Sequence, residues 1–331
     1  MRTQRTLHRI IVLNILWVSG GAAYGQLPRE PATDAQLSPS ETARPQRTPL
    51  ALLPESLSKL VQDAVALNPS RTVYLNRSKK KVYLHTEVSC RSCVLEMLCV
   101  PVGQREHETI LNVRARAFVI HAALTALGLK HGRPVVFYPD YRPPEGPELD
   151  LRVHWLDNTG KPQSQDARSW IRHSIHRYFA HPLPTAPPGI KLPHEELRYD
   201  PFNKEILWYG PMTEKQREHL LSLWNDSEYR KAIGKFYRES QSRPMKAVFV
   251  FTGSRWHTDE RSGRRQYAAE GGHFITVANF PSSTIDVAEP SSSSEGNQTY
   301  EAWEQRIPPE GTPVILEIGP AGQKPGNRAA R

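Results

Sequence analysis

The sequence has few cysteines, no long apolar run and no recognisable catalytic motif. Three cysteines in 331 residues are too few for a disulfide-rich secreted scaffold. No stretch matches the roughly 20 apolar residues that a membrane-spanning helix needs. The absence of a G-x-S-x-G motif removes the usual sequence sign of an α/β-hydrolase nucleophile. Function must therefore be inferred from less specific patterns.

The first 25 residues have the three parts of a secretory signal peptide. Arginines at positions 2, 5 and 9 precede a short apolar run at residues 10–18. Small residues, Ala23 and Gly25, then occupy the two positions that a signal peptidase reads, so cleavage is predicted between Gly25 and Gln26. An uncleaved anchor is the alternative. We expect an exported protein, periplasmic or secreted, with no membrane span after cleavage.

Basic residues are not concentrated on the part of the chain that should fold. The formal net charge is +9, but residues 1–25 and 319–331 each carry three basic residues and no acidic residue. Removing those two contributions leaves a charge of +3 for the remainder. A dedicated nucleic-acid binder would carry a basic patch on its folded domain, so a nucleic-acid partner is not expected.

The order of predicted elements favours an α+β fold, with mixed or antiparallel sheets, packed helices and an inserted helical segment. A linker poor in large apolar residues (26–49) and a disordered tail (319–331) flank it. Helices are expected at 55–67, 115–127, 166–179, 213–224 and 226–237. Strands are expected at 72–75, 81–84, 94–102, 109–113, 134–138, 149–155, 247–251, 272–277, 285–287 and 314–318, and an irregular excursion at 181–212.

Several short motifs resemble those of the bacterial YdjY-domain family in its planctomycete form. They occur in the family's order over residues 70–157 and 246–318, with a looser middle. The motifs are Leu95-Glu96-Met97 followed by Cys99, Glu106-His107-Glu108, His121-Ala122-Ala123-Leu124, Leu127-Gly128, Trp170, Val250-Phe251-Thr252-Gly253-Ser254, Gly271-Gly272, Ala278-Asn279-Phe280-Pro281 and the proline-rich stretch 306–314.

The resemblance implies one YdjY-like domain over residues 50–318, with an elaboration at about 181–243, in an exported protein. It supplies no catalytic residue, because the family has no stated activity. The chain also departs from the family where Cys90-Arg91-Ser92-Cys93 replaces a short glycine turn. Any role of Cys90 and Cys93 is therefore not implied by the family.

Cys90, Cys93 and Cys99 are the disulfide candidates. In an oxidising compartment the C-x-x-C pair, Cys90 with Cys93, tends to close, and Cys90 with Cys99 is the rival pairing. Either choice leaves one thiol, which can pack as a small apolar residue if it is buried. Thiol-redox exchange and metal binding are the alternative roles.

A second group of candidates could ligate zinc or another transition metal. His107, His121, Glu106, Glu108 and Cys99 supply imidazole, carboxylate and thiolate ligands within a short stretch. If Glu106-His107-Glu108 is a strand, its two carboxylates share one face and the imidazole points to the other. The spacing matches no known ligand motif, so a solvated charged turn is the alternative.

Two further groups have weaker signals. Ser254, His257 and His273 contain the residue types of a hydrolase, without the sequence context of one. Glu96 interrupts an apolar strand, so it should face solvent or pair with a base such as Arg105, Arg114 or Arg116.

The sequence as a whole favours an exported domain without enzymatic activity that binds an unidentified ligand or an envelope partner. The alternative is a metal-binding or thiol-redox protein centred on Cys90, Cys93, Cys99, His107 and His121. A hydrolase ranks third.

Overall fold

The computed structural model describes residues 52–187, 196–258, 260, 263–291 and 299–322, which all fall within one unit of the chain, residues 49–331. The predicted signal peptide and linker lie outside these residues, as does most of the predicted tail. The tail prediction begins too early, since the last strand continues to Pro320.

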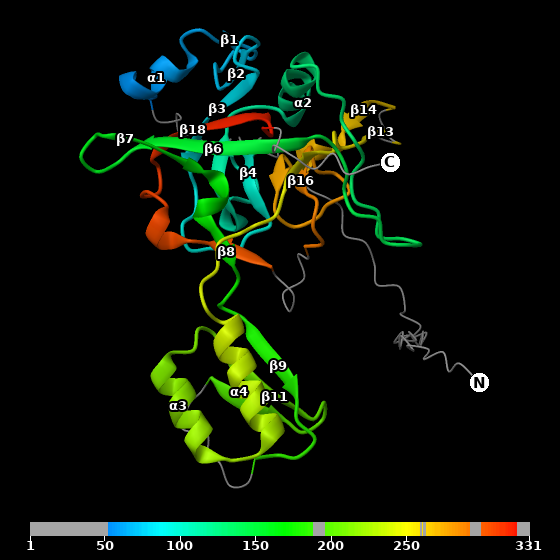
Figure 1. Ribbon diagram of the computed structural model, residues 1–331. Coiled ribbons are helices and arrows are strands. Elements are labelled where there is room, and N and C mark those ends of the chain that lie inside the picture. Colours follow the sequence, from blue (N-terminus) through cyan, green and yellow to red (C-terminus); the bar gives the residue numbers. More distant parts are fainter. Residues whose placement is uncertain (1–51, 188–195, 259, 261–262, 292–298, 323–331) are drawn as a thin grey trace, which may run out of the picture. The chain divides into compact units, whose positions relative to one another are not determined.

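The described part has an α+β fold around one large mixed sheet (Figure 1). Its eleven strands are β1 (Val65–Ala66), β2 (Val73–Asn76), β3 (Lys81–Val88), β4 (Met97–Pro101), β5 (Thr109–Val113), β6 (Glu148–Leu156), β7 (Pro162–Asp166), β12 (Phe249–Phe251), β15 (Ile275–Thr276), β16 (Ile285–Val287) and β18 (Pro313–Pro320).

Eight of these strands pair in a closed ring, in the order β3-β18-β6-β12-β16-β15-β4-β5 and back to β3. The pairs β15–β16 and β4–β5 are parallel, and the other pairs of the ring are antiparallel. Residues such as Val82, Leu84, Val153 and Leu316 from this ring are fully or almost fully buried in one hydrophobic core. Each such side chain contributes about 1.5–3 kcal/mol through its removal from water.

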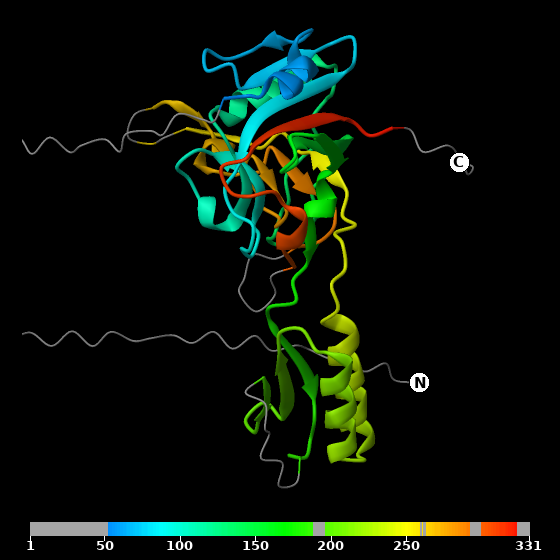
Figure 2. The same ribbon diagram turned by 90° about the vertical axis from the view of Figure 1, so that its left-hand side faces the viewer.

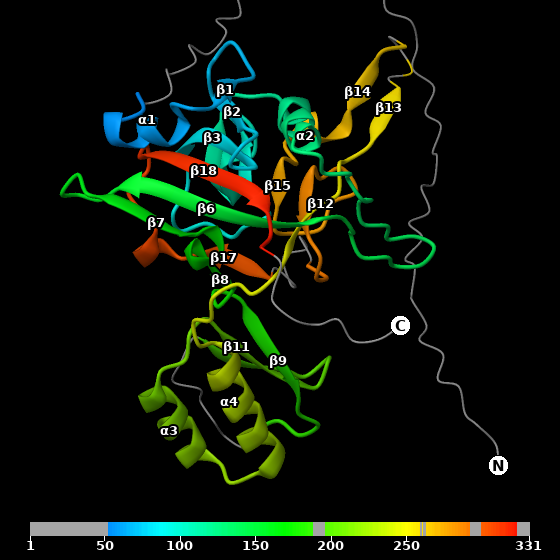
Figure 3. The same ribbon diagram turned by 45° about the horizontal axis from the view of Figure 1, so that its top comes forward.

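Two helices cover parts of this sheet, and β1 and β2 lie between them (Figures 1 and 3). Helix α1 (Glu55–Val61) packs Leu57 and Val61 against Tyr74, Tyr83 and Ile315. Helix α2 (Ala117–Ala126) contacts β2 and β3 and buries Ile120 and Leu124 in the main core. Gly128 follows α2 with a φ of 88°, a backbone conformation that favours glycine and ends the helix.

Residues 178–239 form a second hydrophobic core. Strands β9 (Tyr178–Pro182), β10 (Leu197–Asp200) and β11 (Glu205–Tyr209) pair antiparallel, and α3 (Glu214–Leu223) and α4 (Ser227–Glu239) lie on one face (Figure 2). Thr213 and Asp226 cap the two helices, as their positions predict. An irregular excursion was expected at 181–212, and this expectation is wrong. Ile206 and Trp208 are alternate residues of strand β11, and both side chains are buried in this core.

The helix expected at 166–179 is also absent. Asp166 caps only the short 3₁₀ helix η2 (Ala167–Trp170), and the chain continues as β8 (Ile171–His173). The partner of β8 is β17 (Tyr300–Ala302), about 130 residues later in the chain. Helical spacing of apolar residues cannot reveal a partner at that distance. The remaining two-stranded sheet joins β13 (Trp256–Thr258) and β14 (Arg265–Tyr267).

Two other predictions need correction. Residues 134–138 form no core strand but part of an irregular hairpin, with isolated bridges between Arg133 and Glu145 and between Val136 and Arg142. Helix α1 stops at Val61, since Val65 and Ala66 pair with β2 instead. Among the helices of the described ranges, none is long and apolar enough to cross a bilayer.

Candidate functional site

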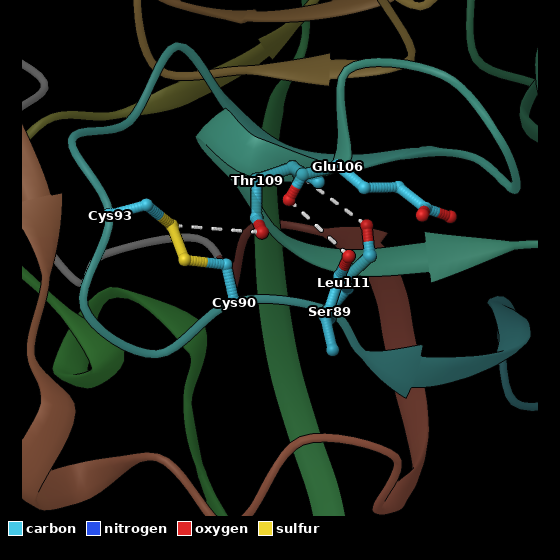
Figure 4. Close-up of a disulfide and its surroundings, with 6 residues drawn as sticks. All are labelled: Ser89, Cys90, Cys93, Glu106, Thr109 and Leu111. Carbon is cyan, nitrogen blue, oxygen red and sulfur yellow. Dashed lines mark hydrogen bonds between the residues drawn. A yellow bond between two sulfur atoms is a disulfide. The ribbon is translucent and has the colours of Figure 1, made fainter.

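The structure joins Cys90 and Cys93 in a disulfide (Figure 4). The loop that holds it is fastened on both sides, because Ser89 N donates to Ile110 O at 2.8 Å and Ala302 N donates to Cys93 O at 2.9 Å. Between the cysteines, the Arg91 guanidinium donates to the carbonyls of Ile307 and Glu304, each at 3.1 Å. The disulfide thus closes a loop that is hydrogen-bonded to β5 on one side, and to β17 and the segment after β17 on the other.

Cys99 takes no part in a disulfide and lies fully buried on β4. Burial raises the pKa of its thiol far above the ordinary value, so the thiolate form that binds metals is not available. The rival pairing of Cys90 with Cys99 is therefore wrong, and Cys99 packs as a small apolar residue.

The metal candidates do not assemble. Glu106-His107-Glu108 is the 3₁₀ helix η1 (Glu106–Glu108), so the strand alternation expected there is wrong. Glu106 accepts from Gly103 N and the Asn112 amide, and the His107 side chain is 83% exposed. Across the described ranges, no three His, Cys, Asp or Glu side chains are grouped to hold a metal ion. The metal-binding hypothesis is therefore not supported.

Arg105 instead organises the acidic residues of this stretch. Its backbone is left-handed, with a φ of 48°, and its guanidinium pairs with both Glu96 and Glu108. A third nitrogen, Nη1, lies 3.3 Å from His273 Nε2. The prediction that Glu96 pairs with a nearby arginine is confirmed, with Arg105 as the partner.

Two groups in this network have shifted pKa values. Burial, followed by the charge of Glu108, raises the pKa of Glu96 to about 7 although Arg105 acts in the opposite direction. Burial, followed by the charge of Arg105, lowers the pKa of His273 to about 4. At neutral pH His273 is therefore uncharged, and Glu96 holds a proton for part of the time.

The hydrolase candidates have other partners. The Ser254 hydroxyl donates to the Ser282 carbonyl at 2.6 Å, and His257 is exposed on β13. His273 Nδ1 lies 2.9 Å from Ser282 Oγ. Arg105 can only donate, so it occupies the Nε2 lone pair, and Nδ1 must carry the hydrogen. This imidazole therefore offers no base to Ser282.

A different group of side chains surrounds His121, the one metal candidate on α2. Its Nδ1 lies 3.0 Å from the Tyr267 hydroxyl, which donates to Gly253 O at 2.9 Å and lies 3.1 Å from Thr284 Oγ1. Burial, followed by the charge of His131, lowers the pKa of His121, so its imidazole is neutral at neutral pH. Burial also raises the pKa of Tyr267, which keeps the hydroxyl protonated.

Five rings form what we call the aromatic cluster: Phe118, His121, His131, Trp256 and Tyr267. Trp256 lies with its ring centroid 5.3 Å from those of Phe118 and Tyr267, and His121 lies 5.3 Å from His131. Tyr267 is buried at the centre, whereas Trp256 is 43% exposed and Phe118 is 39% exposed. The cluster therefore combines a hydrogen-bonded imidazole and phenol with an exposed aromatic surface.

Local backbone features hold the cluster in place. Glu270 accepts hydrogen bonds from Ala117 N and Phe118 N, each at 3.2 Å, and so fixes the first turn of α2. Gly253 has a φ of 81°, and a Cβ there would come within 2.4 Å of the His131 side chain. Glycine is therefore required for β12 to lead into β13 beside His131.

Comparison with known protein families gives a match to part of the chain. The family model of the YdjY domain matches residues 73–180, which confirms the resemblance to that family. No curated protein matches the chain, and no solved structure does. Four strands of the ring, β12, β15, β16 and β18, lie after the matched residues.

Proposed function

We propose that this chain is an exported binding module without enzymatic activity, whose YdjY-like domain covers residues 50–318 and binds an envelope ligand at the aromatic cluster. The ring of strands supports this domain extent, because β18 pairs with both β3 and β6, within the matched residues. Export is supported by the leader pattern at residues 1–25 and by a disulfide, which persists in an oxidising compartment.

The exposed position of Trp256 and Phe118 is the observation that carries the proposal. Exposed aromatic side chains that contact one another form an apolar patch, and aromatic side chains supply much of the binding energy in many interfaces. Tyr267, beneath them, is held by His121, Gly253 and Thr284, so little side-chain entropy is lost on binding.

The thiol-redox alternative has less support. The C-x-x-C pair is closed, and the hydrogen bonds of Arg91 and Cys93 fasten its loop to Ile307, Glu304 and Ala302. This is the setting of a structural disulfide.

Binding to isolated bacterial cell walls tests the proposal. The purified mature protein is expected to pellet with insoluble cell walls, and Trp256→Ala combined with Phe118→Ala is expected to remain in the supernatant. Phe202→Ala is the matched control, because Phe202 is 92% exposed and belongs to no part of the cluster. The proposal fails if the wild-type protein does not pellet, or if the double variant pellets equally well.

A further inference from the structure

The β13–β14 hairpin that carries Trp256 is basic. Its exposed, described residues include Arg255, Arg264 and Arg265 against one acid, Glu260, so their formal charge is +2. This local excess stands out because the remainder of the chain between leader and tail has an ordinary balance of charge. The cations therefore gather where the exposed aromatic rings do.

Arginine and tryptophan are in direct contact on this hairpin. The Arg265 guanidinium carbon lies 5.1 Å from the Trp256 ring centroid, and Arg255 immediately precedes Trp256 in sequence. The guanidinium group of arginine matches a carboxylate with two parallel hydrogen bonds, and it stays charged at every physiological pH. Because this guanidinium lies over the partly exposed Trp256 ring, a ligand that reaches Trp256 also meets a carboxylate-binding group.

We propose that the ligand of the aromatic cluster is an acidic polysaccharide. The C–H face of a sugar ring packs on Trp256 and Phe118, and the carboxylates of uronic acid residues along the chain pair with Arg265 and Arg255. This inference rests on the proposed binding function, and it names the class of ligand.

Other anionic partners fit the hairpin less well. A segment that enters a lipid bilayer exposes several aliphatic or aromatic side chains. On this hairpin Trp256 is the single large apolar side chain among the exposed, described residues. A nucleic-acid partner would require a broader basic surface than a formal charge of +2 provides.

Polygalacturonate and its fully methyl-esterified form make a matched pair of probes, since they share the sugar ring and differ in charge. Affinity electrophoresis of the mature protein should show binding to polygalacturonate at least about tenfold tighter than to the ester, because two exposed ion pairs are worth roughly that factor. The binding should weaken as salt is added.

Two variants separate the charge from the ring. Arg255→Gln with Arg265→Gln should reduce polygalacturonate binding about tenfold without affecting binding to the ester. Trp256→Ala should abolish both. Lys215→Gln, on α3, is the control for a lost surface cation and should bind as wild type.

The inference is overturned if polygalacturonate does not bind, or if it binds no better than its ester. It is equally overturned if single-stranded DNA or anionic phosphatidylglycerol vesicles bind more tightly than polygalacturonate. In each case the cell-wall assay decides the proposed function separately: that function stands if pelleting still depends on Trp256 and Phe118, and fails if it does not.

Discussion

At the scale of single residues, Arg105 links the charged and titratable side chains around the start of the Glu96–Gly128 stretch. It brings together Glu96, Glu108 and His273, which come from three separate elements of the chain. The Glu96–Arg105 pair could be predicted because only nine residues separate the two and a carboxylate in an apolar strand needs a base. His273 could not, since 168 residues separate it from Arg105.

The raised pKa of Glu96 predicts a specific dependence of stability on pH. The native carboxyl has a pKa of about 7, above the ordinary value of 4.5, so between these pH values the native state holds a proton that the unfolded state releases. The stabilisation that Glu96 provides is therefore complete below pH 4.5 and is lost as the pH rises through 7.

Glu96→Gln should remove this contribution while it retains an acceptor for Arg105. We expect the thermal midpoint of the variant to fall less than that of the wild type between pH 5 and pH 8. Glu55→Gln is the control, because its side chain is 89% exposed. Identical pH profiles for Glu96→Gln and the wild type would show that Glu96 titrates normally in the fold.

At the scale of elements, the sequence predicts those that form from local contacts. Helices α2, α3 and α4 and the β2–β3 hairpin occur where spacing, caps and turn residues place them. One cause of failure is a decisive partner far away in the chain. Residues 171–173 pair with β17, and Tyr267 lies 146 residues from His121 in sequence. From the sequence, His121 therefore could not be connected with Tyr267.

The hairpin at 133–145, where a strand was expected at 134–138, gives a direct test of another failure. Its tip exposes Tyr138 (87%) and Phe137 (54%), although their apolar run suggests a core strand. Phe137→Ser or Tyr138→Ser should change the free energy of unfolding by less than about 0.5 kcal/mol, as surface substitutions do.

The matched control lies in the same segment. Val135 is only 2% exposed, so Val135→Ala should cost about 1–2 kcal/mol in a urea titration. A loss of several kcal/mol at Phe137 would show instead that the tip packs against the protein.

At the scale of the whole molecule, the closed ring decides what the folding unit is. The family match ends at residue 180, whereas β12, β15, β16 and β18 come later and supply half of the ring. The segment 178–239 has a core of its own, and the chain returns beside its point of departure, where His173 N donates to Arg243 O at 2.9 Å. The ring should therefore fold without that segment, but not without the strands that follow it.

Two shortened proteins test this division. Replacement of residues 177–241 by a short Gly-Ser linker keeps the bridge between Arg172 and Pro244 and the main core. We expect cooperative urea unfolding and cell-wall binding that still depends on Trp256. The fragment 73–180 keeps the family match but lacks β12, β15, β16 and β18. In it β3 and β6 lose their shared partner β18, and β4 loses β15, so the ring is open and we expect no cooperative transition. Cooperative folding of that fragment would show that the closed ring is not the folding unit, and collapse of the shortened ring would show that the two cores depend on each other.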